Sequence, residues 1–363
     1  VSTMAYRPSL VFVNGEFWGV YNIRERYDAK YFEEHYGVLE ENLVMVEAPS
    51  PLVTNWDYDV PYVLNEGVAG DEVVYHKLMD YISANDMSNP THYNYIEKHI
   101  DLDSFIDFFV CSMYMCNIDW PANNVKVWRN KSATDPSGLD TRWRYVLCDM
   151  DMGMGLEADY NRDMFAHALT PDTVAGIMMN ELLENETFRN KFIERFTYVA
   201  QTVFAPEKCL KIFEEYSAAM KKVIGLHFDR WPSDGGSMNK WQSEINQIKN
   251  FINKRAEYAI STMNTYFGIQ PCMLTASVDL DKADLYINGT KISSTGYNEV
   301  FSDNAKVTVK IVPKSGYVLN GIKTITNGGS EKTYTTQSIT LNVTDRITVI
   351  GLAVCGLLSG KEY

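Results

Sequence analysis

The sequence predicts an α+β protein in two parts: a mixed domain that is mostly helical in its second half, and an all-β sandwich of the immunoglobulin-like type. Apolar residues recur at helical spacing through residues 178–267, whereas residues 272–363 alternate with a period of two. The charge changes at the same place. Residues 272–363 hold nine basic and eight acidic side chains, whereas residues 1–271 hold 24 basic and 39 acidic side chains. At 363 residues two domains are expected, and we place them at 1–271 and 272–363.

Composition excludes several classes of protein. Hydrophobic residues make up 45% of the chain and charged residues 22%, which are ordinary globular values. No apolar run approaches the roughly 18 residues that span a bilayer. The net charge of -14 argues against a nucleic-acid binder, because phosphate contacts need clustered Lys and Arg. An acidic chain suits cations or basic substrates, although solubility alone also explains it.

Two strand-like runs at the start of the chain predict a β-hairpin. They flank Asn14-Gly15, and both central positions of a tight type I′ turn require positive φ. Because the chain starts within a strand-like stretch and shows no signal peptide, we expect a trimmed chain. The remaining predictions for the first 150 residues are a helix at 24–37, an irregular segment at 46–70, helices at 73–84, 93–99 and 102–116, and strands at 125–128 and 142–147. The helix at 102–116 is apolar almost all round, so it should be buried.

The second half begins with helices and ends with strands. A long helix is predicted to end before Pro271, with one apolar face. That face comprises Trp241, Ile245, Ile248, Ile252, Ala259, Met263 and Phe267. The following module is expected to be an antiparallel sandwich with a second hairpin turn at Asn288-Gly289 and no metal or nucleotide site. The cysteine spacings fit no zinc pattern, and a disulfide between Cys272 and Cys355 is left open.

A polar segment after the buried helix carries the first chemical motif. Asp119 and Asn124 stand five residues apart in Asn117-Ile118-Asp119-Trp120-Pro121-Ala122-Asn123-Asn124. This is the Asp-x-x-x-x-Asn spacing of a protein-kinase catalytic loop, in which the aspartate accepts the proton of the substrate hydroxyl and the asparagine holds Mg²⁺. The His-Arg that normally precedes this aspartate is absent. An Asx-rich turn before a strand gives the same pattern.

The second motif follows the next predicted strand. Asp149 and Asp151 are two residues apart, and Asp151-Met152-Gly153 has the Asp-x-Gly form of the kinase metal-binding motif. On an extended strand both carboxylates would point to one face. Their mutual repulsion calls for a cation, and oxygen ligands suit Mg²⁺ or Mn²⁺. Two solvated carboxylates at a strand end remain the alternative.

The two motifs and the hairpin together resemble a particular family. FVNGEFWGVYNIRERYD, NIDWPANNVKVWRN and WRYVLCDMDMGMG are similar to the three signatures of the CotH family of atypical, spore-coat-type protein kinases. The helical tail with FRNKFIERF and Arg255 also resembles that family. The resemblance covers residues 5 to 268 and implies an atypical protein-kinase-like fold. It further implies Mg²⁺-dependent transfer of the ATP γ-phosphate to Ser or Thr of a protein substrate, by a bacterial protein that is secreted or at the cell surface.

The resemblance also assigns roles to residues. Asp119 would be the catalytic base, Asn124 and Asp151 would hold metal, and Asp149 would be a second ligand or a support for Asp151. Arg24 and Glu25 would lie near the nucleotide. Glu25 could instead begin a helix and face its dipole.

One departure from the family pattern leaves rival functions open. The family's upstream strands, with a phosphate-covering segment and a lysine, are not seen ahead of the hairpin, where no Gly-rich loop occurs and the first lysine is Lys30. We expect that this segment was cut off, is disordered or has been lost. A degenerate kinase-like scaffold that acts in surface binding or assembly, or a carbohydrate-linked accessory protein, is the alternative.

Overall fold

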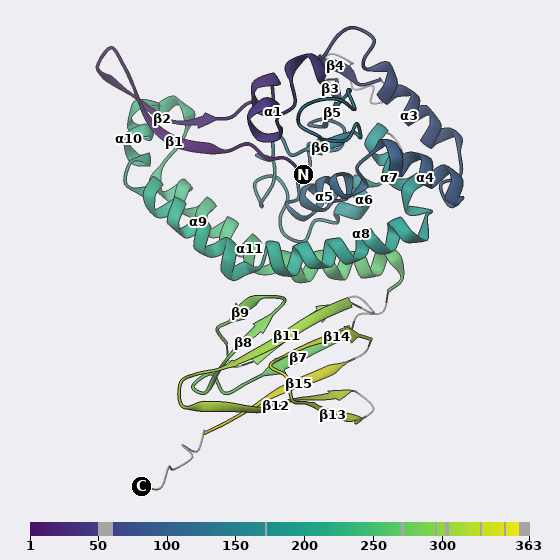
Figure 1. The fold of residues 1–363 in the computed structure, drawn as a ribbon. Coiled ribbons are helices and arrows are strands. Elements are labelled where there is room, and N and C mark those ends of the chain that lie inside the picture. The colour runs from purple at the N-terminus through teal and green to yellow at the C-terminus, as the bar shows by residue number, and fades with distance from the viewer. Residues whose placement is uncertain are drawn as a thin grey trace. The chain divides into compact units, whose positions relative to one another are not determined.

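A computed structural model shows an α+β protein with several sheets (Figure 1). It describes residues 1–49, 61–170, 173–269, 272–294, 296–301, 305–326, 329–344 and 346–355. The chain divides into two compact units. The first comprises Val1–Arg195 and Pro206–Arg255, and the second comprises Phe196–Ala205 and Ala256–Tyr363.

The described helices are α1 (Ala29–Tyr36), α3 (Val73–Ala84), α4 (Pro90–His99), α5 (Leu102–Tyr114), α6 (Met164–Ala168), α7 (Val174–Leu183), α8 (Glu186–Tyr198), α9 (Pro206–Lys221), α10 (Ile224–Arg230) and α11 (Met238–Phe267). The strands before α11 are β1 (Tyr6–Val13), β2 (Glu16–Arg24), β3 (Leu43–Glu47), β4 (Val63–Glu66), β5 (Lys126–Asn130) and β6 (Arg144–Val146). The strands after α11 are β7 (Cys272–Ser277), β8 (Ala283–Ile287), β9 (Thr290–Ile292), β10 (Gly296–Phe301), β11 (Ala305–Pro313), β12 (Tyr317–Thr326), β13 (Glu331–Tyr334), β14 (Ser338–Val343) and β15 (Ile347–Cys355).

The predicted hairpin at the start of the chain is confirmed. Strands β1 and β2 are joined by Asn14 and Gly15, which both have positive φ (51° and 84°) as the turn requires. The hairpin lies beside α10 (Figure 1), where the Trp231 indole N–H donates to the Trp18 carbonyl at 2.7 Å. The Val20 amide donates to Nδ1 of His227 on the same helix at 3.1 Å.

A four-stranded sheet, in the order β4-β3-β5-β6, organises the first unit. Alternating side chains of its strands face opposite sides of the sheet. On one side, Trp128 packs against Phe32 of α1, with ring centroids 4.3 Å apart. On the other, Tyr145 packs against Phe105 and Phe108 of α5, at 5.0 and 5.1 Å. The sheet is therefore covered by α1 and α5.

Helix α5 is buried almost all round, as its sequence predicted. Ten of its 13 residues are buried, including Phe105, Phe109 and Tyr114. Asp101 caps its N-terminus by accepting from the Ser104 amide at 3.2 Å. The buried helix therefore fixes the position at which the polar segment after it begins.

Several predicted elements were wrong in extent. The helix expected at 24–37 begins only at Ala29, because β2 continues to Arg24, which pairs with Tyr6, and Asp28 caps the helix by accepting from the Tyr31 amide. The segment at 46–70, expected to be irregular, contains the end of β3 and all of β4. Its residues 50–60 lie outside the described part of the chain. The long helix is confirmed as α11, and on its predicted face Ile252, Ala259 and Met263 are buried.

In the second unit two sheets share one hydrophobic core. A five-stranded sheet has the order β10-β7-β15-β12-β13, and a four-stranded sheet has the order β14-β11-β8-β9. Leu274 and Val349 of the first and Leu285 and Val309 of the second are all fully buried in the same cluster. The turn Asn288-Gly289 joins β8 to β9 with positive φ at both residues, as predicted.

The purely antiparallel module that the sequence predicted is wrong in one strand pair. Strands β7 and β15 run parallel, with Leu274 opposite Ile347. The immunoglobulin-like classification stays a prediction. The Cys355 side chain lies outside the described residues. Cys272 lies near the start of β15 and Cys355 ends that strand eight residues later, so the register separates the two backbones well beyond the roughly 7 Å that a disulfide allows.

Candidate functional site

Two loops that carry the predicted site residues meet at one edge of the β4-β3-β5-β6 sheet. Strand β5 begins at Lys126 and β6 ends at Val146, and these two residues pair in the antiparallel register. The loop before β5 and the loop after β6 therefore leave the sheet at the same place. The Cys148 thiol joins them by donating to the Asn124 carbonyl at 3.2 Å.

Asp119 lies in the first loop with two asparagine side chains around it. Its Oδ2 accepts from Nδ2 of Asn124 at 2.8 Å and from Nδ2 of Asn123 at 3.0 Å. Asn124 has positive φ (59°), a conformation that asparagine tolerates better than most residues. Because both amides donate to Oδ2, Oδ1 of Asp119 and Oδ1 of Asn124 are the oxygens left for a ligand.

Asp149 and Asp151 also meet, although not on a strand as the sequence predicted. Strand β6 ends at Val146, Asp149 has positive φ (48°), and Asp151 lies in the following turn. Desolvation raises the pKa of Asp149, and the negative charge of Asp151, a hydrogen bond between the two side chains and the charge of Asp119 raise it further. The two loops thus bring three carboxyl groups into one cluster with Asn124, which we call the acid cluster: Asp119, Asn124, Asp149 and Asp151.

The two residues predicted near the nucleotide occupy different environments. Arg24 ends β2, is exposed, and its positive charge partly lowers the pKa of Asp149, so it lies near the acid cluster. Glu25 instead accepts from the Ala5 amide at 2.7 Å and contacts Nε2 of His35 at 2.8 Å. These two bonds lower the pKa of Glu25. The alternative that Glu25 begins helix α1 is wrong, because Asp28 is the capping residue.

Three neighbours of the acid cluster were not singled out from the sequence. Lys126 forms an ion pair with Glu47 directly across the β3–β5 register, and both charges act on the Cys148 thiol. Asn117 is fully buried and donates from Nδ2 to the Asp149 carbonyl at 3.1 Å. For the pair of Lys126 and Glu47, the only sequence signal was a lysine that begins a strand after an asparagine-rich loop. Asn117 lay inside the first chemical motif, but no role was assigned to it.

The donor set of the acid cluster fits a hard divalent cation. Its free atoms are carboxylate and amide oxygens, which are the ligands of Mg²⁺ and Mn²⁺. Contact with Asp151 raises the pKa of Asp149. A bound cation would lower this pKa again. Among the described residues no group of three or more His, Cys, Asp or Glu side chains is arranged to hold a metal by itself.

The Asp149 pKa gives a prediction for stability. Folding raises this pKa, so the repulsion between the carboxylates of Asp149 and Asp151 is absent below pH 3.8, the ordinary pKa of an aspartate. As the pH rises from there through the pKa of the folded state, the repulsion lowers the stability of the protein. Without divalent cations, Asp149→Asn should raise the melting temperature by about 1–3 °C at pH 7 and by less at pH 4.

Asp140→Asn is the matched control with the opposite sign. Burial would raise the Asp140 pKa, but hydrogen bonds from Arg142 and Arg144 lower it to about 2. This variant should therefore melt lower than the wild type at pH 7. Thermal scans from pH 4 to pH 8 check both variants, and a lower melting temperature for Asp149→Asn at pH 7 would contradict the repulsion.

Gly153 allows a second prediction. A Cβ at Gly153 would lie 2.8 Å from the Met115 carbonyl oxygen and 3.1 Å from that of Met150. Both obstacles are backbone atoms, so Gly153→Ala should cost about 1–3 kcal/mol of unfolding free energy. Gly296→Ala, with nothing within 4 Å of its Cβ, should change stability by less than about 0.5 kcal/mol. Urea titration of both variants measures their free energies of unfolding. Equal stabilities would show that the turn at Gly153 accommodates a Cβ without loss of stability.

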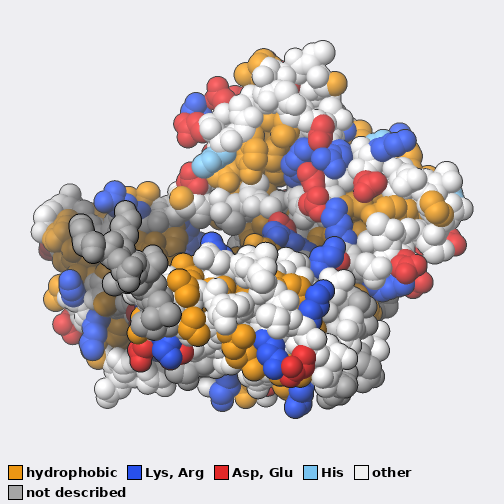
Figure 2. All heavy atoms as spheres, turned by 60° about the horizontal axis from the view of Figure 1, so that its bottom comes forward, with side chains coloured by type: hydrophobic (Ala, Val, Ile, Leu, Met, Phe, Trp, Pro, Cys, Tyr) orange, Lys and Arg blue, Asp and Glu red, His pale blue; other side chains and the backbone are white. Residues whose placement is uncertain are grey.

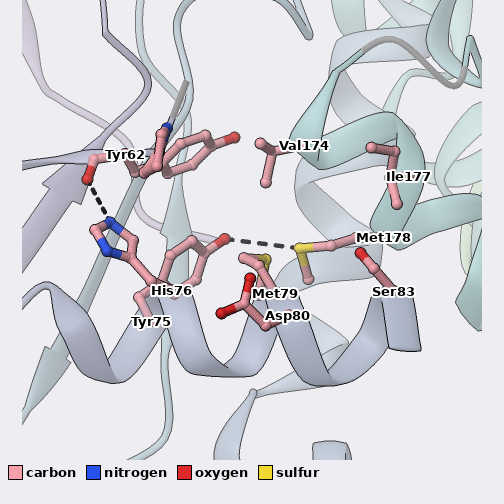
Figure 3. Close-up of a pocket in the computed structure, with 10 residues that line it drawn as sticks. Tyr62, Tyr75, His76, Met79, Asp80, Ser83, Val174, Ile177 and Met178 are labelled. Atoms are coloured by element: carbon pink, nitrogen blue, oxygen red, sulfur yellow. Dashed lines mark hydrogen bonds between the residues drawn. The ribbon is translucent and has the colours of Figure 1, made fainter. Parts of the chain in front are cut away.

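A separate cavity lies between α3 and α7 (Figure 3). Its volume is about 130 Å³. The residues that line it are Pro61, Tyr62, Tyr75, His76, Met79, Asp80, Ser83, Val174, Ile177 and Met178. In Figure 3 the Tyr75 hydroxyl points to Sδ of Met178 at 3.7 Å, and His76 bonds the Tyr62 carbonyl at 2.7 Å. None of the predicted site residues lines this cavity, so it is distinct from the acid cluster.

The described surface shows no concentration of basic side chains on the face drawn in Figure 2, where Lys and Arg are interspersed with Asp and Glu. That a nucleic acid is not a partner remains a prediction from the net charge. Within the described part of the chain, every helix falls short of the combined length and hydrophobicity that crossing a bilayer requires.

Comparison with known proteins decides the family. The family described as CotH kinase protein matches residues 1–259, which is more than half of the chain. The chain belongs to the CotH kinase family. This confirms the resemblance seen in the hairpin and the two aspartate motifs. A search of curated proteins found no match.

Membership in the CotH kinase family makes this a kinase-like protein. In general terms, such a family uses a nucleotide and a metal and acts on a protein substrate. All four residues of the acid cluster, together with Arg24 and Glu25, lie within the matched residues. The particular roles of these residues stay predictions.

Proposed function

We propose that the protein is a Mg²⁺-dependent kinase that transfers the γ-phosphate of ATP to a Ser or Thr hydroxyl of a protein substrate. The observation that carries this proposal is the acid cluster. Asp119 contacts Asn124 directly, and it lies close enough to Asp149 for its charge to raise the pKa of that residue, which is also in contact with Asp151. The family supplies the reaction class, and the cluster supplies the groups that the reaction needs.

Asp119 is the proposed catalytic base. The substrate hydroxyl oxygen attacks the γ-phosphorus, the bond from that phosphorus to the β–γ bridging oxygen breaks, and ADP leaves. The hydroxyl proton passes to Oδ1 of Asp119, while Asn123 and Asn124 hold the carboxylate through Oδ2. Geometry of this kind matters because phosphoryl transfer depends on positioning more than on covalent chemistry.

Asn124 and Asp151 are the proposed metal ligands, and Asp149 is a second ligand or a support for Asp151. When bound, Mg²⁺ or Mn²⁺ neutralises the charge on the phosphate oxygens. The pKa of Asp149 is raised by the charge of Asp151 and lowered by that of Arg24, so a carboxylate and a guanidinium both act on this residue. We assign Arg24 to the phosphates of the nucleotide. Glu25, which holds Ala5 and His35, would act there by fixing the end of β2.

A location outside the cell or at the cell surface of a bacterium is part of the same proposal. It rests on the resemblance to spore-coat kinases. The rival is a degenerate scaffold that binds a surface partner without phosphoryl transfer, and it is distinguished by the experiment below.

The test is an incubation of the protein with γ-labelled ATP, MgCl₂ and a generic Ser/Thr-rich acceptor protein, followed by phosphopeptide mapping. The proposal predicts label on serine or threonine and equimolar ADP, both lost when EDTA is added. Nucleotide binding without any transfer of label would favour the scaffold. Transfer that persists in EDTA would contradict the assigned metal.

A further inference from the structure

Arg255 of helix α11 is a buried cation that donates four hydrogen bonds to backbone carbonyls. It is only 2% exposed. Its Nε donates to the Tyr114 carbonyl at 2.8 Å and Nη2 donates to that of Met113 at 2.8 Å. Its Nη1 donates to the carbonyls of Tyr160 and Arg162 at 2.6 and 3.0 Å. A buried guanidinium is costly unless its N–H groups are bonded in this way.

The four carbonyls belong to the two segments that carry the acid cluster. Met113 and Tyr114 form the last turn of α5, where helix carbonyls lack intrahelical partners and the partial negative charge of the helix end favours a cation. The loop with Asp119 follows that turn. Tyr160 and Arg162 follow the turn that contains Asp151. One side chain thus bonds both segments next to the cluster.

Further bonds continue this connection toward the cluster. The Met154 amide donates to the Met115 carbonyl at 2.7 Å, and the Cys116 thiol donates to the Asp159 carbonyl at 3.8 Å. Nearest the cluster, Asn117 donates to the Asp149 carbonyl. Together with Arg255, these bonds tie the first segment to the second at several points between residues 113–117 and 149–162.

We propose that Arg255 is a positioning residue that sets the separation between Asp119 and the Asp149–Asp151 pair. The kinetic part of this inference rests on the proposed kinase function, whereas its structural part rests on the bonds alone. A planar guanidinium with five N–H groups reaches four carbonyls in two directions, and an ammonium on a flexible stem does not reproduce that fork. Arg255→Lys therefore keeps the charge and loses the geometry.

Arg144→Lys is the matched control. Arg144 is also largely buried, with 11% of its side chain exposed, and it also donates to carbonyls, those of Asp140 and Arg142. These two bonds stay within the turn that precedes β6, and the ion pairs of Arg144 join it to Asp140 in that turn and to Asp101 at the start of α5. The same chemical change is therefore made at a similar depth without touching the connection between the two segments.

The experiment compares the wild type and both variants by amide hydrogen exchange, by thermal denaturation and by steady-state kinetics. For Arg255→Lys we expect at least about tenfold less protection in residues 115–124 and 149–155, with α3 unchanged. We also expect kcat to fall by about 10–100-fold with the KM for ATP within about threefold, because small displacements of reacting groups are costly. Arg144→Lys should show neither change.

Exchange that rises uniformly through the first unit, with kcat falling only in proportion to folded protein, would make Arg255 merely structural and overturn the proposal. Unchanged exchange in both loops would also overturn it. If the wild type shows no transfer, the kinase proposal fails, and exchange confined to the two loops still decides the positioning role. If Arg255→Lys does not fold, Asn117→Ala tests the same connection, with the same loosening expected and its absence contradicting the proposal.

Discussion

Replacing Asp119 by asparagine is expected to reduce phosphoryl transfer by about 10²–10⁴-fold while the dissociation constant for Mg²⁺-ATP stays within about twofold. The amide keeps the size of the carboxylate and still accepts a hydrogen bond, but it does not take the proton of the substrate hydroxyl. Calorimetric titration of nucleotide and single-turnover transfer assays separate the two quantities. The loss should therefore appear in the chemical step.

Asn123→Ala is the control for this variant. It removes one of the two amides that donate to Oδ2 of Asp119 and leaves the carboxylate in place. We expect its rate to fall by less than about tenfold. Full activity in Asp119→Asn would remove the catalytic-loop assignment, and the scaffold function would then lead.

Asp151→Asn is expected to have a larger effect of a different kind. It removes a charge that we assign to the cation, so Mg²⁺-ATP affinity and turnover should fall together. Metal neutralisation is worth several kcal/mol, and each 1.36 kcal/mol is tenfold in rate, so turnover should drop by about 10³-fold or more. The same titrations measure it, repeated over a range of Mg²⁺ concentrations.

Asp159→Asn is the control for Asp151→Asn. Asp159 is an exposed aspartate eight residues further along the same segment, and its carboxylate accepts from the Tyr160 amide. Its replacement should leave both affinity and turnover unchanged. A normal Mg²⁺ dependence in Asp151→Asn, or an identical loss of affinity in Asp119→Asn, would show that the base and the metal ligand have been confused.

The parts of the fold that local sequence determines were predicted well. Asn14-Gly15 specifies its turn through the φ values that it tolerates, and the apolar sequence of α5 specifies its burial. Strand β3 was missed because its partner β5 lies far away in the chain and its short apolar run carries no turn signal. Helix α1 was predicted to begin too early because the pairing of Arg24 with Tyr6 extends β2.

The residue types of the candidate site were predictable, but its geometry was not. Asp119 and Asn124 were brought together by their spacing, and the structure joins them by a hydrogen bond. Asp149 and Asp151 were expected to align on a strand, whereas the positive φ of Asp149 and a turn bring their carboxyls together. The bonds of Arg255 span more than 90 residues of chain. No local pattern reports contacts of that range.

Anomalous diffraction from crystals grown with MnCl₂ and a non-hydrolysable ATP analogue tests the central claim most directly. Mn²⁺ takes the same oxygen ligands as Mg²⁺ and gives a signal that identifies its position. We predict a manganese peak in contact with a carboxylate oxygen of Asp151 and Oδ1 of Asn124, with Oδ1 of Asp119 left free for the substrate. Bound nucleotide with its manganese away from Asp151 and Asn124 would contradict the account.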